Sequence, residues 1–362
     1  MTGSPMVITR LRGAFVLLAT VLLSVGLVAP TASAAPPSRS DIESPAHRIV
    51  EQAIDPGDYV CGPTALDAYF EELLGQLTES DLEFLLTTEA LDIPTYDALL
   101  FGTASDPEYA LEGQARQLQN TFRDLRRFWD IDSSDIQLLA MHGDVLLDVD
   151  RVARVLVVAF GYTEADAAAR AQYIADTVAS VPAFQGGDNP IFTLNAFAFS
   201  GEGETDPLFA SIPDKIIMGD GVIDFLEAIG IGDVGPRLVL AHEFAHHIQF
   251  ELGLFDSPLT GAEATRRTEL MADAYATYYA VHARGLALNT RRVLEAEQTF
   301  YEVGDCFFDD PGHHGTPQQR MRASAWAAAL ANDARPQGAI LSAEAFAALF
   351  DAELPELVAP DA

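Results

Sequence analysis

The stretch His242-Glu243-Phe244-Ala245-His246 decides how the rest of this 362-residue chain is interpreted. On a helix, residues four positions apart lie on one face, one turn from each other. His242 and His246 can therefore present two imidazole nitrogens to one Zn²⁺. Glu243 follows the first histidine directly and lies beside the metal without binding it. This spacing is typical of the zinc-binding helix of a metal-dependent hydrolase, with Glu243 as the general base.

The residues around the motif predict a buried helix. Pro236 suits its first turn, and Gly253 suits the residue at which it stops. Most positions between them are apolar, so the two histidines and the glutamate are isolated polar groups on a hydrophobic helix. Burying such groups without a metal or other partners is costly. This context favours a metal site over a chance match.

A catalytic zinc site usually has three protein ligands, and the histidines supply two. Glu269 is the best third ligand, and it shares the next predicted helix, about 263–284, with Asp273. The two carboxylates are four positions apart and face the same way. We expect Glu269 to bind the metal and Asp273 to accept the free N–H of a ligating histidine. The alternative, a solvated acidic pair, is common in acidic chains, but this apolar helix one loop after the histidines favours ligands.

The wider pattern predicts an α+β fold that is mostly helical, with a small sheet beside the zinc helix. Residues 57–185 form a helical, acidic region in this prediction, either a subdomain or a pro-segment that shields the active site. Strand-forming residues follow at 191–199 and 215–218, ahead of the zinc helix. We assign 186–335 as the catalytic region and 336–362 as a C-terminal helix and tail.

The first 34 residues carry the three parts of a secretory signal peptide. Two arginines precede an apolar run at 13–29, and Ala32-Ser33-Ala34 supplies the small residues that a signal peptidase needs. We expect cleavage after Ala34, a linker over 35–56, and a secreted, extracellular protein with no membrane contact after cleavage. The alternative is an uncleaved membrane anchor, for which the apolar run is slightly short.

The chain is strongly acidic, because 54 Asp and Glu residues against 21 Lys and Arg give a net charge of −33. Such a chain repels nucleic acid and anionic membrane surfaces, so we expect neither as a partner. The acidic surface fits adaptation to a salty medium. It fits equally well a coding preference or a need for solubility.

The chain has two cysteines, Cys61 and Cys306. In an exported protein an even pair predicts a disulfide, which would tie the N-terminal region to the end of the catalytic region. Two separate buried thiols are the alternative. Neither cysteine has the spacing of a metal site.

Together, these motifs resemble those of the gluzincin metallopeptidases, and most closely a bacterial family of neutral zinc metallopeptidases. Residues 239–249 (VLAHEFAHHIQ) and 269–275 (ELMADAY) are similar to that family's two central motifs. The segment 314–320 (HGTPQQR) and the predicted strands at 195–198 and 216–218 add to the resemblance. The family's cysteine and aromatic segment just before the zinc helix are missing from this chain.

The resemblance implies a zincin-like catalytic region that hydrolyses peptide bonds. Zinc would activate water and polarise the scissile carbonyl, while Glu243 carries the proton to the leaving amine. It also implies that the strand edge at 195–198 pairs with an extended substrate. The reaction needs an oxyanion donor as well. We select His314 for this role, from candidates that also include His313, Tyr275 and Tyr278.

We therefore expect a secreted zinc metallopeptidase that acts on a protein or peptide substrate. Two other interpretations stay open: an exported, non-catalytic metal-binding protein with the same fold, and a zinc hydrolase of a non-peptide amide. The intact Glu243 argues against the non-catalytic protein, because a degenerate site usually loses its base first.

Overall fold

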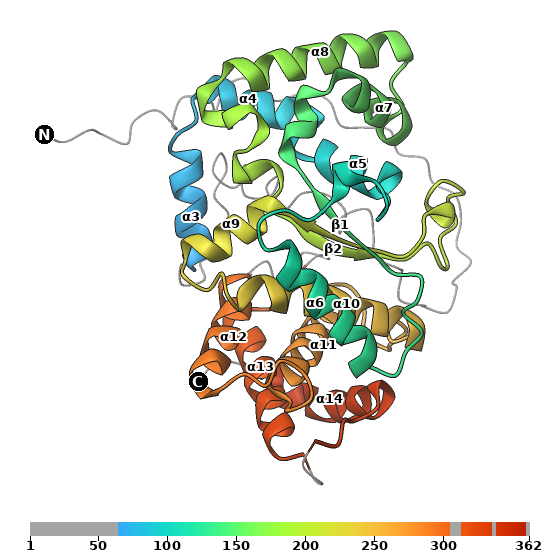
Figure 1. Cartoon of the computed structure of the whole chain (residues 1–362), viewed down its shortest axis with the longest axis vertical. Coiled ribbons are helices and arrows are strands. Elements are labelled where there is room, and N and C mark those ends of the chain that lie inside the picture. Colours follow the sequence, from blue (N-terminus) through green and yellow to red (C-terminus); the bar gives the residue numbers. More distant parts are fainter. Residues whose placement is uncertain (1–63, 305–312, 335–337, 360–362) are drawn as a thin grey trace, which may run out of the picture.

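The computed structural model describes residues 64–304, 313–334 and 338–359 (Figure 1). Most of these residues are helical, and a small three-stranded sheet lies among the helices. The fold is therefore α+β and mostly helical, as the sequence predicts.

Several expectations concern residues that the structure does not describe. They are the signal peptide at 1–34, the linker at 35–56 and the disulfide between Cys61 and Cys306, and they stay predictions. Within the described part of the chain, no helix combines the length and the apolar character needed to span a membrane.

The sheet has the strand order β1-β3-β2. Strand β3 (Lys215–Gly219) is central and fully buried. Strand β1 (Gln137–Met141) runs parallel to it, and β2 (Ala196–Phe199) runs antiparallel on the other side. β2 is thus an edge strand among the described residues, and it lies against the helix that carries the histidine motif.

Twelve helices surround the sheet in the described residues. Their bounds are α3 Ala65–Leu74, α4 Glu79–Thr87, α5 Ile93–Phe101, α6 Ala115–Phe128, α7 Val149–Phe160, α8 Glu164–Ser180, α9 Asp220–Ala228, α10 Gly235–Leu252, α11 Ala262–Val281, α12 Thr290–Glu302, α13 Pro317–Asn332 and α14 Ala343–Leu357. Short 3₁₀ helices lie at Glu89–Leu91, Pro107–Tyr109, Gly143–Leu147, Pro182–Gly187, Pro190–Phe192 and Phe209–Ser211.

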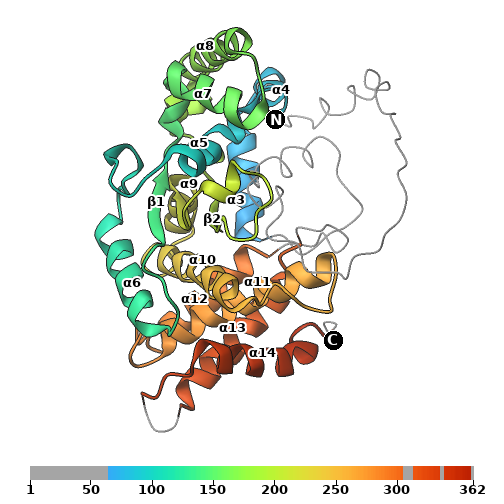
Figure 2. The ribbon, with the colours of Figure 1, turned by 90° about the vertical axis from the view of Figure 1, so that its right-hand side faces the viewer.

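The helices form two layers with the sheet between them (Figures 1 and 2). One layer contains α4, α5, α7 and α8, and the other contains α6 and α10 to α14. Strand side chains alternate between the two cores, because successive residues point to opposite faces. Leu139 and Ile217 pack into the first core, while Ile216 and Met218 pack into the second, beside α10 and α11.

Lys215, the first residue of β3, contacts both layers of helices. Lys215, the only lysine of the chain, is buried, and its Nζ donates to the carbonyls of Leu99 (2.5 Å) and Gly102 (2.7 Å) at the end of α5. On the opposite side, His247 of α10 donates its Nε2–H to the Lys215 carbonyl (3.0 Å), and its Nδ1 lies 3.2 Å from the Asp214 carboxylate. These contacts fix α10 against the sheet.

Strand β1 corrects the prediction that 57–185 is wholly helical. Its sequence, QLLAM, has no β-branched residue and is too short to show a period. Its strand conformation depends on pairing with β3, which lies far along the chain. The sheet therefore joins segments on both sides of residue 186.

Other differences are local. Within the region expected to be helical, α6 begins only at Ala115, after Gly113 adopts a φ of 54°. The strand expected over 191–199 begins only at Ala196, because Pro190–Phe192 forms a 3₁₀ turn.

Candidate metal centre

Helix α10 places two histidines in the centre of the second core. It begins at Gly235 with Pro236 in its first turn, and it ends where Gly253 takes a left-handed φ of 62°. Both ends match the sequence prediction. Most of the helix is buried, including His242 and Glu243, while His246 is half-buried.

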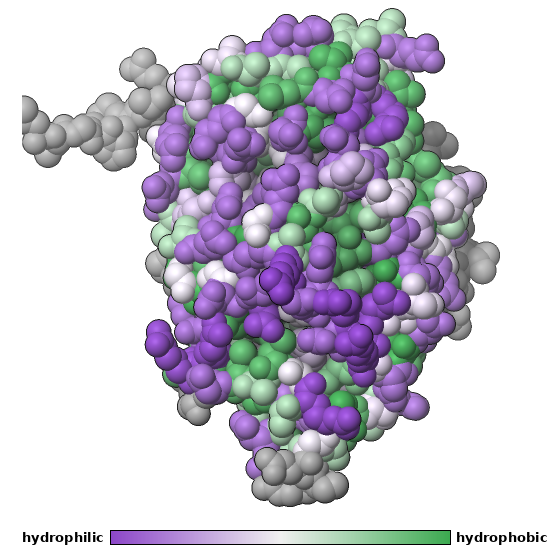
Figure 3. Space-filling view, in the orientation of Figure 1, coloured by the Kyte–Doolittle hydropathy of each residue, from purple (hydrophilic) through white to green (hydrophobic). Residues whose placement is uncertain are grey.

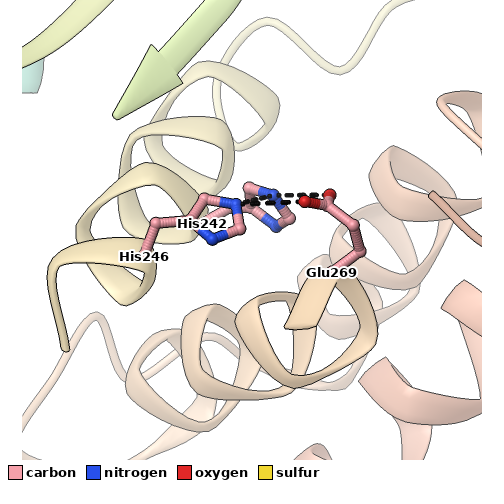
Figure 4. A group of neighbouring side chains, drawn as sticks. All are labelled: His242, His246 and Glu269. Carbon is pink, nitrogen blue, oxygen red and sulfur yellow. Dashed lines mark hydrogen bonds and ion pairs between the residues drawn. The ribbon is translucent and has the colours of Figure 1, made fainter. Parts of the chain in front are cut away.

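Helix α11 packs beside α10 and completes a cluster of three side chains (Figure 4). The Nε2 atoms of His242 and His246 are 3.1 Å apart. Glu269 faces both rings, with Oε2 3.3 Å from Nε2 of His242 and Oε1 3.4 Å from Nε2 of His246. The structure thus brings the three predicted metal ligands together, although they come from two helices.

The cluster has the dimensions of a zinc site. A tetrahedral ion with ligand bonds of 2.0–2.1 Å separates its ligand atoms by about 3.3 Å. The three distances in the cluster match that edge length, so these three residues could hold one metal ion. Two imidazoles and one carboxylate are also a donor set that suits zinc, with one tetrahedral position left for a further ligand.

The far side of each imidazole ring is held by a hydrogen bond. Nδ1 of His242 lies 2.8 Å from Oδ1 of Asp273, and Nδ1 of His246 lies 2.9 Å from Oε1 of Gln249. Gln249 is itself oriented, because its Nε2 donates to the Thr268 carbonyl (2.8 Å). Protons on both Nδ1 atoms leave the Nε2 lone pairs free for a metal.

Asp273 is in turn held by Arg320 of α13. Nε and Nη2 of Arg320 donate to Oδ2 and Oδ1 of Asp273, and both donor–acceptor distances are 2.7 Å. Both side chains are buried. Nη1 of Arg320 also donates to the Val303 carbonyl (3.1 Å) just after α12. A chain of hydrogen bonds therefore runs from α13 through α11 to the ring of His242.

The pKa values of the two histidines are shifted in opposite directions. Burial lowers the pKa of His242, but its hydrogen bonds to Asp273 and Glu269 outweigh burial and raise the pKa to about 10. Burial lowers the pKa of His246 to about 4. Burial raises the pKa of Glu269, but the charges of His314, His246 and His242 lower it by more, so that it lies well below its usual value. Without metal, these shifts favour a protonated His242 and an ionised Glu269 at neutral pH.

Glu243 is buried beside the cluster without belonging to it. Burial raises its pKa to about 8, and the negative charge of Glu269 adds to the effect, while His242 and His314 oppose it. A carboxyl group with a pKa in this range can accept and return a proton near neutral pH.

The structure brings one oxyanion candidate to the site and excludes two. His314 is half-buried, and its charge lowers the pKa of both Glu243 and Glu269. Tyr275 and Tyr278 are wrong as candidates, because they lie about 120° and 180° around α11 from Glu269. The Tyr275 hydroxyl donates to the Ala343 carbonyl, and the Tyr278 hydroxyl accepts from the Leu341 amide.

Three residues of the site were missed at the sequence level. Gln249 had a local signal, since it follows His246 by three positions on the same helix. Arg320 lies in the segment 314–320 that adds to the resemblance, but its contact with Asp273 depends on how α13 packs on α11. The same holds for Phe300 of α12, whose ring lies 5.9 Å from that of His242 and covers the cluster on that side.

Comparison with models of known protein families, with curated proteins and with solved structures finds no match for this chain. The described residues define a class of site, a two-histidine, one-carboxylate cluster with a buried acid beside it. The resemblance to gluzincins rests on the motifs alone.

Replacing Glu269 by alanine should weaken zinc binding by about two orders of magnitude or more, because it removes one of three ligands. The measurement is zinc content after dialysis, by elemental analysis, with a chelator competition for the affinity. Glu263→Ala is the matched control, since Glu263 is an exposed carboxylate on the same helix. A full zinc equivalent retained by Glu269→Ala would reject Glu269 as a ligand.

Zinc binding should release protons and strengthen as pH rises. His242 has a raised pKa of about 10, so at pH 7 a metal must displace its proton. One displaced proton changes the affinity by about tenfold per pH unit below that pKa. Calorimetry in buffers of different ionisation enthalpy should show at least one proton released per zinc at pH 7. Binding without proton release would contradict this assignment.

Proposed function

We propose that this chain is an exported zinc-dependent hydrolase of the gluzincin type, which cleaves peptide bonds in a protein or peptide substrate. The observation that carries the proposal is the triangle of His242, His246 and Glu269, with the buried Glu243 beside it. A zinc ion held there would supply Lewis-acid chemistry, activating water and polarising the scissile carbonyl.

Glu243 is suited to moving the proton. It follows His242 on α10, lies outside the ligand set and has a pKa raised to about 8 by burial. Its carboxylate takes a proton from the attacking water and returns it to the leaving amine. His314, whose charge lowers the pKa of Glu243 and Glu269, donates a hydrogen bond to the developing oxyanion.

The edge strand β2 supports a peptide as substrate. It is paired with β3 on one side, it contacts α10, and Ala196 and Ala198 are half-exposed. An extended peptide can add to such an edge through main-chain hydrogen bonds. Just before the strand, the buried Nδ2 of Asn195 has no hydrogen-bond acceptor among the described residues. A substrate carbonyl would satisfy this donor.

The order of the layers also supports a zincin-like arrangement. The motif helix α10 lies directly under the sheet, the antiparallel edge strand is the strand that contacts it most, and the third ligand comes from the next helix. This arrangement leaves Glu243 and the three ligands on the side of the sheet that α10 and α11 cover.

Replacing Glu243 by glutamine should lower kcat by about 10²- to 10⁴-fold while zinc content stays at the wild-type level, because the amide cannot take the proton. The assay is cleavage of a denatured protein with and without a chelator, beside elemental analysis. Normal turnover by Glu243→Gln would remove the mechanism. If the wild-type protein holds zinc but cleaves no protein, the result favours one of the two alternative functions. These are the hydrolysis of small amides and metal binding without catalysis.

Replacing Asn195 by alanine should lower kcat/KM for peptides by about tenfold, because a buried donor to the substrate backbone is lost. Steady-state kinetics on a series of peptides of increasing length would measure this, with Asn120→Ala on the exposed face of α6 as the control. Equal kcat/KM for wild type and Asn195→Ala would show that Asn195 does not bind substrate.

A further inference from the structure

A hollow of about 620 Å³ opens on the face of the molecule that carries α6. We call it the arginine hollow, and it is lined by Arg116, Gln117 and Asn120 of α6, Asp233, Arg237 of α10 and Arg292 of α12. Figure 3 shows strongly hydrophilic residues gathered over α6 on this face. Three guanidinium groups around one hollow are unusual in a chain with a net charge of −33.

Arg237 is the central observation. Its side chain is half-buried, and its Nε donates to Oγ1 of Thr121 (3.0 Å). Among the described residues, no carboxylate lies within 4 Å of Arg237 or Arg116. Burial lowers the pKa of Arg237, and the nearby Arg292 lowers it further, while Tyr279, Asp124 and Asp233 raise it. A partly buried cation without a counter-ion is costly, and a chain with 54 acidic residues does not lack candidates.

The other charges in the hollow leave it positive. Asp233 is exposed and pairs with Arg292 (2.8 Å), which also lies 3.6 Å from Glu295. Arg116 and Arg237 therefore form no ion pair within the described residues, and with Arg292 they give the lining three positive charges against the one negative charge of Asp233. Behind Arg237, the buried hydroxyl of Tyr279 interacts with it electrostatically and has no hydrogen-bond partner in that part of the chain.

The hollow is separate from the metal centre. Arg237 precedes His242 by five positions on α10, which turns its side chain by about 140° around the helix. Its contact with Thr121 places it toward α6, whereas His242 faces α11. A ligand in the arginine hollow would therefore not occupy the position of the scissile bond.

We propose that the arginine hollow binds a small oxyanion, namely a phosphate or carboxylate group carried on a polar molecule. Guanidinium groups bind both kinds of oxyanion through paired N–H donors. The amides of Gln117 and Asn120 line the same hollow and suit a polar rather than an apolar body. A volume of about 620 Å³ has room for such a molecule beyond its anionic group.

Isothermal titration of the full chain with inorganic phosphate and, separately, with citrate tests the proposal. We expect saturable one-to-one binding of at least one probe, which weakens as NaCl is added. Arg237→Gln and Arg116→Gln should each raise Kd by about tenfold, because each removes a charge-assisted contact. Arg127→Gln, on the same side of α6 but outside the hollow, should leave Kd within about twofold of wild type.

The two probes distinguish the sources of the oxyanion: tighter phosphate binding points to a phosphoryl ligand, and tighter citrate binding to a polycarboxylate. The exposed Arg116 keeps the test valid if Arg237→Gln does not fold. His242→Ala, which removes the metal centre, should bind the probe as wild type does. The proposal is overturned if neither probe saturates, if Arg127→Gln weakens binding as much as Arg116→Gln, or if His242→Ala abolishes binding.

Discussion

The buried ion pair between Asp273 and Arg320 is the interaction on which the metal centre depends. Asp273 is fully buried between α10, α11 and α13, where an isolated carboxylate would be strongly unfavourable. Two hydrogen bonds from Arg320 and one from His242 offset that cost. Because the geometry of all three bonds must be good at once, the pair also fixes how the three helices pack. The orientation of the His242 ring follows from that packing.

The metal centre divides into a part that follows from local sequence and a part that does not. The spacing of His242 and His246 predicts one shared face because it depends only on helix geometry. Glu269 could be selected from its place on the next apolar helix. Arg320 and Phe300 reach the site through packing between helices separated by loops, and no local period encodes that. Tyr275 and Tyr278, which were named beside His314 as further candidates for the oxyanion donor, are excluded by the same helix geometry that made the histidines predictable.

The sheet shows the same division. β2 and β3 are rich in strand-forming residues and were expected, whereas β1 is a strand only because β3 pairs with it. Lys215 could not be assigned a role from sequence, since its three carbonyl acceptors lie more than a hundred residues earlier in the chain. Together with His247 it holds β3 between the layers, and this places the edge strand β2 over α10. Local sequence patterns thus predict the strands β2 and β3, and long-range polar contacts determine where these strands lie.

Most of the more buried arginines pair with a carboxylate, but some do not. In an acidic chain each arginine has many possible partners, and the buried ones use them: Arg151 binds Asp97, Arg267 binds Asp351 and Arg320 binds Asp273. Arg237 and Arg266 are half-buried and form no ion pair among the described residues, and the exposed Arg116, which lines the same hollow as Arg237, forms none either. Desolvation makes such an arrangement unfavourable in the free protein. A bound anion from outside the chain would offset that cost for Arg237.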